Sequence, residues 1–192
     1  MGVSSASNGL ARSAVFLDRD GVLNEPVVID GRPHPPESAG DLIVHPDTIE
    51  ACERLHDAGL LLLVVTNQPD IARGQQTWAG VEAINSELRR RLPLDDVRVC
   101  PHDDKDHCRC RKPAPGLLVD GASAWNIDLG HSVMVGDRWR DVEAGKRAGC
   151  AVVLIKRDYA ESPALANADL VVAALREAVP WILKTTKRET DS

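Results

Sequence analysis

Two carboxylates stand two residues apart in the segment Asp18-Arg19-Asp20-Gly21, directly after a short apolar run. A carboxylate is a competent nucleophile toward phosphorus when a cation screens the approaching phosphate. A second carboxylate nearby can protonate the leaving oxygen and then deprotonate water. Asp18 and Asp20 are therefore candidates for these two roles. Taken alone, the pattern fits a solvated acidic pair in a turn at Gly21 better than it fits a reaction centre.

Two other short segments have residues that could hold an anion. Thr66 and Asn67 follow a very apolar run and offer a hydroxyl, an amide and main-chain N–H groups. A turn or a helix cap is the simpler interpretation of this pair alone. Arg111 and Lys112 offer two cations in front of Pro113, and Lys112 could neutralise a phosphate. The alternative is a solvated basic pair.

A third segment offers further carboxylates, because Asp137 follows Gly136 and Asp141 comes four residues later. Mg²⁺ takes oxygen ligands, typically one or two carboxylates together with substrate phosphate and water. Asp137 is therefore a candidate magnesium ligand. Asp141 could join it or could cap the helix that follows.

Three thiols and an imidazole lie within eleven residues, in the order Cys100, His102, Cys108 and Cys110. This donor set is typical of a tetrahedral Zn²⁺ site, and pairs spaced by one residue can face one ion in a tight turn. His107 is an alternative ligand to His102. With four protein ligands the site would be closed, so the sequence predicts a structural zinc ion rather than a catalytic one.

The other two cysteines, Cys52 and Cys150, stand in apolar contexts and are expected to be packing residues. An odd number of cysteines fits a reducing cytoplasm better than a disulfide framework. The chain has 29 acidic and 23 basic residues and a net charge of −6, which argues against a general nucleic-acid binder. No apolar run approaches the roughly 20 residues of a membrane-spanning helix, and residues 1–13 do not resemble a secretory signal.

Alternating apolar and amphipathic segments predict an α/β fold. We expect strands at residues 14–18, 60–65, 97–100, 132–135, 151–155 and 170–172. We expect a helix with Asp47 as its N-cap, and Glu50 would complete a capping box there. Gly59 is expected to end this helix. Further helices are expected at residues 77–92, after Pro115, at residues 139–148, and up to residue 183.

This pattern favours a Rossmann-like, open, mainly parallel sheet with helices on both faces and no separate cap domain. Residues 14–183 are expected to form a single domain, between a flexible N-terminus at 1–13 and a flexible tail at 184–192. Prolines in the stretch 25–41 exclude a helix or a central strand there. Sites on such sheets lie beyond the carboxyl ends of the strands. Asp18, Thr66 and Asp137 all follow predicted strands, so we expect them to meet.

The order of these segments resembles the four motifs of the haloacid dehalogenase (HAD) superfamily. The resemblance covers residues 14–155, and Phe16-Leu-Asp-Arg-Asp-Gly-Val-Leu-Asn24 is similar to the superfamily's first motif. It is closest to the branch that holds heptose bisphosphate phosphatases and the phosphatase half of bifunctional histidine-biosynthesis enzymes. Three further matches support that branch: Thr66-Asn-Gln68, Ile71-Ala-Arg-Gly74 and Cys110-Arg-Lys-Pro113. The family pattern also favours His102 as the fourth zinc ligand.

The resemblance implies a role for each candidate residue. Asp18 would form an aspartyl-phosphate and Asp20 would act as general acid/base. Mg²⁺ would be bound by the Asp18 side chain, the Asp20 main-chain carbonyl and Asp137. The transferring phosphoryl group would be held by Thr66, Asn67 and Lys112. The phosphate that stays on the substrate would be bound by Arg111, with help from Arg138 and Arg73.

The implied substrate is a small phosphorylated sugar, first of all a heptose bisphosphate losing its 7-phosphate, and the enzyme is expected to be a cytoplasmic monomer. The loops depart from the family pattern, since Pro69-Asp70 replaces the usual Ser-Gly and the stretch 27–36 is unusual. The chemistry is therefore better defined than the sugar. Histidinol phosphate or another sugar phosphate is the nearest alternative substrate. A DNA 3′-phosphatase is disfavoured by the acidic charge, and a non-catalytic zinc-stabilised binding module is the remote alternative.

Overall fold

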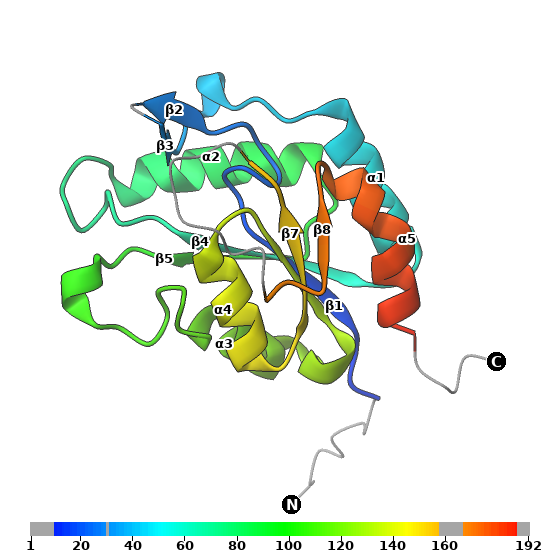
Figure 1. The fold of residues 1–192 in the computed structure, drawn as a ribbon. Helices are drawn as coiled ribbons and strands as arrows, with labels where there is room; N and C mark the ends of the chain where they lie inside the picture. The colour runs from blue at the N-terminus through cyan, green and yellow to red at the C-terminus, as the bar shows by residue number, and fades with distance from the viewer. Residues whose placement is uncertain (1–9, 30, 158–166, 188–192) are drawn as a thin grey trace, which may run out of the picture.

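A parallel sheet of six strands forms the centre of the part that the structure describes, residues 10–29, 31–157 and 167–187 of a computed structural model. The strands lie in the order β5-β4-β1-β6-β7-β8, and β1 is therefore central (Figure 1). Their bounds are β1 Ala14–Leu17, β4 Leu61–Asn67, β5 Asp96–Cys100, β6 Val133–Gly136, β7 Ala151–Ile155 and β8 Leu170–Val172. The register pairs Phe16 of β1 with Leu63 on one side and Met134 on the other. The expected parallel α/β sheet is confirmed.

Helices cover both faces of this sheet (Figure 1). The helices of one face are α1 Pro46–Asp57, α2 Trp78–Arg91 and α5 Leu175–Thr185, and those of the other are α3 Gly116–Trp125 and α4 Trp139–Ala148. Successive strand residues point to opposite faces. In β1, Val15 and Leu17 thus pack with α1, α2 and α5, whereas Phe16 packs with α3 and α4. This double cover explains why the inner strands β1, β4, β6 and β7 are apolar at nearly every position.

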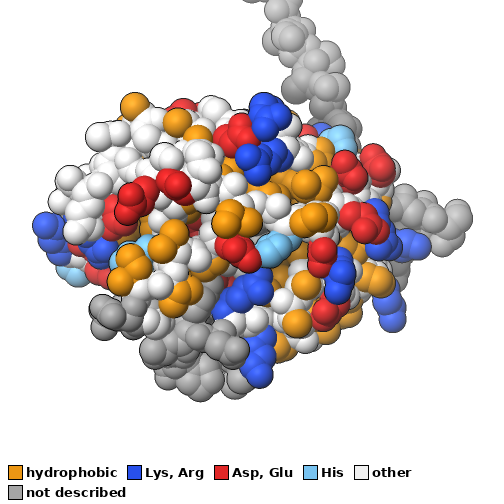
Figure 2. Space-filling view, turned by 90° about the horizontal axis from the view of Figure 1, so that it is seen from above, with side chains coloured by type: hydrophobic (Ala, Val, Ile, Leu, Met, Phe, Trp, Pro, Cys, Tyr) orange, Lys and Arg blue, Asp and Glu red, His pale blue; other side chains and the backbone are white. Residues whose placement is uncertain are grey.

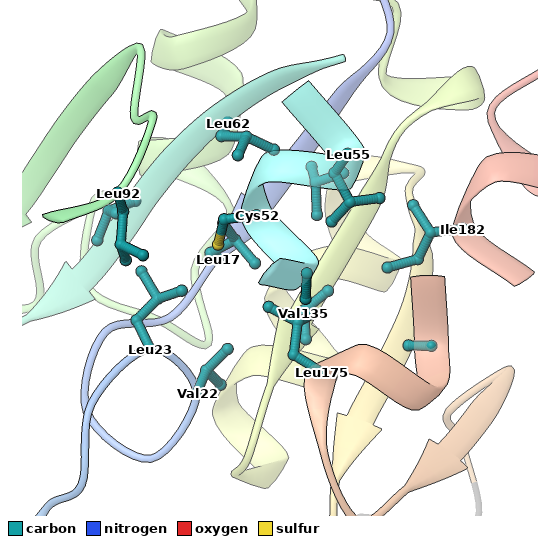
Figure 3. Packing of buried hydrophobic residues seen from close by; sticks show 14 of the residues in the cluster. Leu17, Val22, Leu23, Cys52, Leu55, Leu62, Leu92, Val135, Leu175 and Ile182 are labelled. Carbon is teal, nitrogen blue, oxygen red and sulfur yellow. The ribbon is translucent and has the colours of Figure 1, made fainter. Parts of the chain in front are cut away.

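The larger of the two cores lies between the sheet and helices α1, α2 and α5. Figure 3 shows Leu17 and Leu62 from the strands facing Cys52 and Leu55 of α1, with Ile182 of α5 beside them. Burying a leucine side chain stabilises a protein by roughly 1.5–3 kcal/mol. Cys52 and Cys150 are both buried in apolar surroundings, as expected, and all five cysteines are free thiols.

The proline-rich stretch after β1 forms a hairpin that the sequence interpretation did not foresee. It consists of β2 Val27–Ile29 and β3 Arg32–His34, which pair antiparallel outside the main sheet. A proline cannot donate a ladder hydrogen bond, so Pro33 is acceptable only in such an edge pair. The expected absence of a central strand here agrees with this arrangement.

The start of α1 differs from the expected capping box. The helix begins at Pro46, with His45 as N-cap and without a side-chain cap hydrogen bond. Proline is favoured in the first turn because its φ is already helical and its missing N–H has no partner there anyway. Asp47 therefore lies inside the first turn and is not the N-cap. The other helix boundaries agree closely with the sequence: α2 follows the cap Thr77, and α4 spans the expected residues.

The ordered chain extends past both expected domain boundaries. Before Ala14, the main chain of Arg12 donates to Asn126 O at 2.8 Å and accepts from Asp128 N at 2.9 Å. At the other end, α5 continues to Thr185, and the buried Thr186 accepts a hydrogen bond from Ser13 at its main-chain oxygen. The boundaries at residues 13 and 183 are thus too narrow, while 1–9 and 188–192 lie outside the described residues.

Among the described helices, none has the length and hydropathy needed to cross a membrane. Figure 2 views the molecule from above, and acidic, basic and hydrophobic side chains are interspersed over the face that the described residues form there. The described residues of this face thus present charges of both signs.

Candidate active site

The strand ends of β4, β1 and β6 meet at one edge of the sheet, because these three strands are neighbours and run parallel. A cavity of about 610 Å³ opens there. Most of the predicted site residues line it: Asp18, Asp20, Thr66, Asn67, Arg73, Arg111, Lys112, Arg138 and Asp141. The lining also includes residues that the sequence interpretation did not single out, among them Pro33, His34, Gln68, Asp104 and Arg140. The cavity is therefore the candidate active site.

The buried ammonium of Lys112 lies between two carboxylates at the bottom of this site. Its Nζ is 2.8 Å from Asp18 Oδ1 and 2.6 Å from Asp141 Oδ1. Burial raises the pKa of Asp18 to about 6, because it outweighs the opposing attraction of Lys112. Burial alone would lower the pKa of Lys112, but Asp141 and Asp18 together raise it above its usual range. Lys112 is thus a fixed cation at neutral pH.

Three buried carboxylates, those of Asp18, Asp137 and Asp141, have ligand oxygens within 4.8 Å of one another. Like charges this close repel strongly in a poorly solvated site, so a divalent cation would stabilise the arrangement. Carboxylate oxygens are the ligands that Mg²⁺ prefers. The residues therefore fit a magnesium ion, with Asp141 as an addition to the expected set.

Of the two roles that the sequence left open for Asp141, the structure shows the helix cap. Its Oδ2 accepts a hydrogen bond from Arg138 N at 3.0 Å and so caps α4, while Oδ1 holds Lys112. The side chain fits only because residue 136 is a glycine: a Cβ there would overlap the Cβ of Asp141. The glycine at position 136 is thus explained by close packing at the end of β6.

Asp20 is held by three neighbours that all donate to its carboxylate. The donors are Arg19 Nη2 at 2.9 Å, Asn24 Nδ2 at 3.0 Å and Gln68 Nε2 at 2.9 Å. Burial would raise the pKa of Asp20, but the charge and hydrogen bonds of Arg19 outweigh it and lower the pKa below its usual value. Asp20 is therefore a carboxylate in the free protein.

Two of these donors link Asp20 to other elements. The guanidinium of Arg19 is fully buried and also donates to Asn85 of α2 at 3.0 Å. Gln68 donates to Thr66 Oγ1 at 2.9 Å, so one amide connects the carboxylate after β1 with the hydroxyl at the end of β4. The sequence interpretation missed these roles, although Gln68 belongs to the quoted Thr66-Asn-Gln68 match.

Asn67 clamps the main chain of Lys112. Its Nδ2 donates to Lys112 O at 3.0 Å, and its Oδ1 accepts from Lys112 N at 3.1 Å. The expected position of this amide was beside a phosphoryl group, but the structure places both of its polar atoms on the lysine's backbone. Asn67 is therefore a positioning residue for Lys112.

Three of the arginines that line the cavity, Arg73, Arg111 and Arg140, already bind acidic side chains, so they are not the free basic set that the sequence suggested. Arg73 binds Asp103 through two hydrogen bonds of 2.9 Å and contacts Asp70 at 3.2 Å. Arg111 and Arg140 both bind Asp104, at 2.8 and 2.9 Å. Neighbouring guanidinium groups lower the pKa of Asp103 and of Asp104.

The expected zinc ligands come together in the loop after β5. His102 Nδ1 lies 3.6 Å from Cys100 Sγ and 3.3 Å from Cys110 Sγ, and the thiol sulfurs lie 3.2–3.6 Å apart. A tetrahedron with Zn–S bonds of about 2.3 Å has edges of about 3.8 Å, so the four atoms can surround one ion. Burial raises the pKa of the Cys100 thiol, and a bound cation would favour its thiolate. His107 lies outside the cluster, at the end of the short helix Asp104–Asp106.

The parallel sheet and its row of acidic and basic groups at the carboxyl edge define a hydrolase of the HAD class. A family model described as HAD-hydrolase-like matches residues 109–178. A structure of D,D-heptose 1,7-bisphosphate phosphatase from B. bronchiseptica, complexed with magnesium and phosphate, superposes with a TM-score of 0.76 at 31% identity and covers 90% of this chain and 98% of that one.

Sequence relatives narrow this class. The D-glycero-β-D-manno-heptose-1,7-bisphosphate 7-phosphatase of Pseudomonas aeruginosa is 38% identical over 152 residues, which are 77% of this chain and 83% of the relative. The enzyme of the same name from Vibrio cholerae is 32% identical over 194 residues, 93% of this chain and 100% of the relative. The chain belongs to the heptose-1,7-bisphosphate 7-phosphatase family of HAD-like hydrolases.

Proposed function

We propose that this chain is a Mg²⁺-dependent phosphatase that removes the 7-phosphate of D-glycero-D-manno-heptose 1,7-bisphosphate. The observation that carries the proposal is the buried ammonium of Lys112 between Asp18 and Asp141, with Asp20 held beside them. This set supplies a nucleophile, a proton carrier and a positive charge where a phosphoryl group must sit. The names of the relatives support the heptose as substrate.

The reaction would proceed in two steps at Asp18. Its carboxylate attacks phosphorus, the bond from phosphorus to the sugar oxygen breaks, and that oxygen takes the proton of Asp20. Water then attacks the aspartyl-phosphate, Asp20 takes the proton of the water, and inorganic phosphate leaves with Asp18 restored. Lys112 offsets the charge on the phosphoryl oxygens in both steps. Thr66 would donate its hydroxyl to these oxygens.

Asp20 must be protonated for the first step and ionised for the second. In the free protein its pKa is lowered, chiefly by Arg19 against the effect of burial. An incoming phosphate would raise that pKa again, because a second negative charge nearby disfavours the carboxylate. The ionised form is then ready to activate water once the sugar has left.

Metal ions complete the proposal. Asp18, the Asp20 main-chain carbonyl and Asp137 would hold Mg²⁺, which when bound supplies positive charge that reduces repulsion between Asp18 and the phosphate. A structural Zn²⁺ would be held by Cys100, His102, Cys108 and Cys110.

The phosphate that stays on the sugar would be bound by Arg111, Arg138 and Arg73. We place the enzyme in the cytoplasm, where thiols stay reduced, and we propose that it is a monomer.

The test is phosphate release from both anomers of the heptose bisphosphate, with histidinol phosphate beside them. We expect the heptose bisphosphate to be the best substrate, and faster turnover of histidinol phosphate would move the enzyme to the other activity of this branch. Asp18→Asn should lower turnover by roughly a thousandfold or more, because the amide cannot attack phosphorus. Wild-type rates in that variant would show that Asp18 is not the nucleophile.

A further inference from the structure

Asp104 carries one carboxylate between two arginines of the cavity. Its Oδ1 lies 2.8 Å from Arg111 Nε and 2.9 Å from Arg140 Nη1. Asp104 belongs to the short helix Asp104–Asp106 and itself lines the cavity. This helix is part of the loop between β5 and α3 that carries Cys108 and Cys110, called here the cysteine loop. A carboxylate and a phosphate are both oxyanions that accept hydrogen bonds from arginine forks, so a site of two guanidinium groups that binds one can also bind the other.

The two arginines have other contacts that fix them, whereas Asp104 extends into solvent. Arg111 is 11% exposed and donates to His102 O at 3.2 Å. Arg140 is 25% exposed, donates to Lys112 O at 3.4 Å, and lies over the ring of Trp139 at 4.9 Å. The Asp104 side chain is 57% exposed. It can therefore leave without disturbing the packing, and the arginines would stay in place.

This arginine pair lies next to the reaction centre. Arg140 contacts the main-chain oxygen of Lys112, and the side chain of the same Lys112 holds Asp18. A substrate with one phosphate at Asp18 and a second anionic group can thus reach both guanidinium groups.

We propose that Asp104 is a specificity-determining residue whose carboxylate occupies the position of the substrate's second anionic group until the substrate displaces it. This inference rests on the proposed phosphatase function. A phosphate dianion carries more charge than a carboxylate and can replace it at both arginines. A hydroxyl cannot, so a monophosphate leaves the ion pairs of Asp104 intact and gains nothing from them. Asp104 therefore sets the affinity difference between bisphosphates and monophosphates.

The test measures inhibition of p-nitrophenyl phosphate hydrolysis by fructose 1,6-bisphosphate and by fructose 6-phosphate. In Asp104→Asn we expect the Ki of the bisphosphate to fall about two- to tenfold relative to that of the monophosphate, because each partly exposed ion pair that no longer competes is worth at most a few-fold. Asp104→Glu keeps the charge and should return the ratio toward the wild-type value.

Asp120→Asn is the matched control. Asp120 forms an ion pair of 3.0 Å with Arg109, which stands in the same cysteine loop but outside the cavity lining. This variant removes the same charge and should leave the Ki ratio unchanged. An unchanged or higher bisphosphate Ki in Asp104→Asn would overturn the proposal, because Asp104 would then only support the arginines. An equal fall for both inhibitors would also overturn it, since the effect would be general electrostatics.

A crystal structure of Asp18→Asn with fructose 1,6-bisphosphate bound gives a second readout that leaves Asp104 itself unchanged. We expect the Asp104 carboxylate to lie farther than about 3.5 Å from both guanidinium groups. A carboxylate still bound to both would overturn the proposal. Neither experiment depends on the heptose: failure of the wild type to hydrolyse heptose bisphosphate would overturn the proposed substrate and leave the Ki ratio as an independent result.

Discussion

Asp18 is a buried carboxylate whose ionised form is poorly solvated, and this has a consequence for stability. Burial raises its pKa from 3.8 to about 6. Between these two values the native protein binds the proton of Asp18 more tightly than the unfolded chain does. The free energy of unfolding should therefore fall as the pH rises from about 4 to about 6, and the loss should persist above pH 6.

Replacing Asp18 with Asn removes this pH-dependent cost. In magnesium-free buffer we expect Asp18→Asn to unfold with a free energy about 1–3 kcal/mol higher than the wild type at pH 7, because a shift of one pKa unit corresponds to about 1.4 kcal/mol. The difference should shrink as the pH falls toward 4 and vanish at about pH 3, because below the unfolded-state pKa of 3.8 Asp18 is protonated in both states. Urea denaturation at pH 7 and at about pH 3 measures it. A variant less stable than wild type at pH 7 would contradict the prediction, and Asp120→Asn is the control for removing an acid elsewhere.

For individual residues, the sequence indicated which side chains line the cavity better than it indicated which side chains contact each other. Asp18, Asp20, Thr66 and Lys112 could be expected in one cavity because their segments follow the order of the superfamily's motifs, although each segment alone is ambiguous. The clamp of Asn67 on Lys112 joins residues 45 positions apart, and no local pattern encodes such a pairing. Asp104 was missed for the same reason, since its partner Arg140 is 36 positions away.

The cysteine loop is the element that joins the proposed zinc site to the reaction centre. It leads directly from Cys110 into Arg111 and Lys112, and its acidic residues bind the cavity's arginines. A metal ion held by residues on both sides of the loop would fix its path, as ligand shells commonly do. The position of Lys112 should therefore depend on the metal.

Removal of two ligands tests this dependence. We expect about one zinc per chain in the native protein, and loss of zinc in Cys108→Ser/Cys110→Ser together with a fall in phosphatase activity of about tenfold or more. Elemental analysis and p-nitrophenyl phosphate hydrolysis give the two readings. Cys52→Ala is the control, because Cys52 lies in the core and away from the cluster. A native protein without zinc would show that the four residues do not form a metal site.

Elements of the main sheet were predicted more accurately than those outside it. Buried strands such as β7 are continuous apolar runs, and the double cover by helices leaves this pattern uninterrupted. The β2–β3 hairpin has three exposed apolar residues and a proline, so it follows no burial pattern that a sequence could reveal. The first turn of α1 was misplaced because Pro46, rather than an acidic cap, determines where it begins.

The net charge of −6 belongs to the whole molecule and says little about the site. Five cations and five acids line the cavity, so the described lining is balanced within itself: Arg73, Arg111, Lys112, Arg138 and Arg140 against Asp18, Asp20, Asp70, Asp104 and Asp141. A cavity with equal numbers of cations and acids attracts a phosphate only where an acidic side chain moves away from its arginine or is neutralised by a bound cation. We therefore expect selectivity for an anionic substrate to arise from local exchange of partners and not from the overall field.

Residues near the two ends of the described chain contact each other, and these contacts indicate which terminal residues contribute to stability. Ser13 donates to Thr186 O at 3.2 Å, and Thr186 Oγ1 donates to Ile182 O at 2.9 Å. A chain that ends at residue 183 loses both hydrogen bonds and the last turn of α5, whereas one that ends at 187 keeps them. Each such hydrogen bond contributes about 0.5–1.5 kcal/mol. We expect the free energy of unfolding of the shorter chain, measured by urea denaturation, to be about 1–3 kcal/mol lower than that of the longer one. Hydrolysis of p-nitrophenyl phosphate should be retained, because the cavity lies at the carboxyl ends of the strands, opposite the end of α5. Equal stability of the two chains would instead place the end of the domain at residue 183.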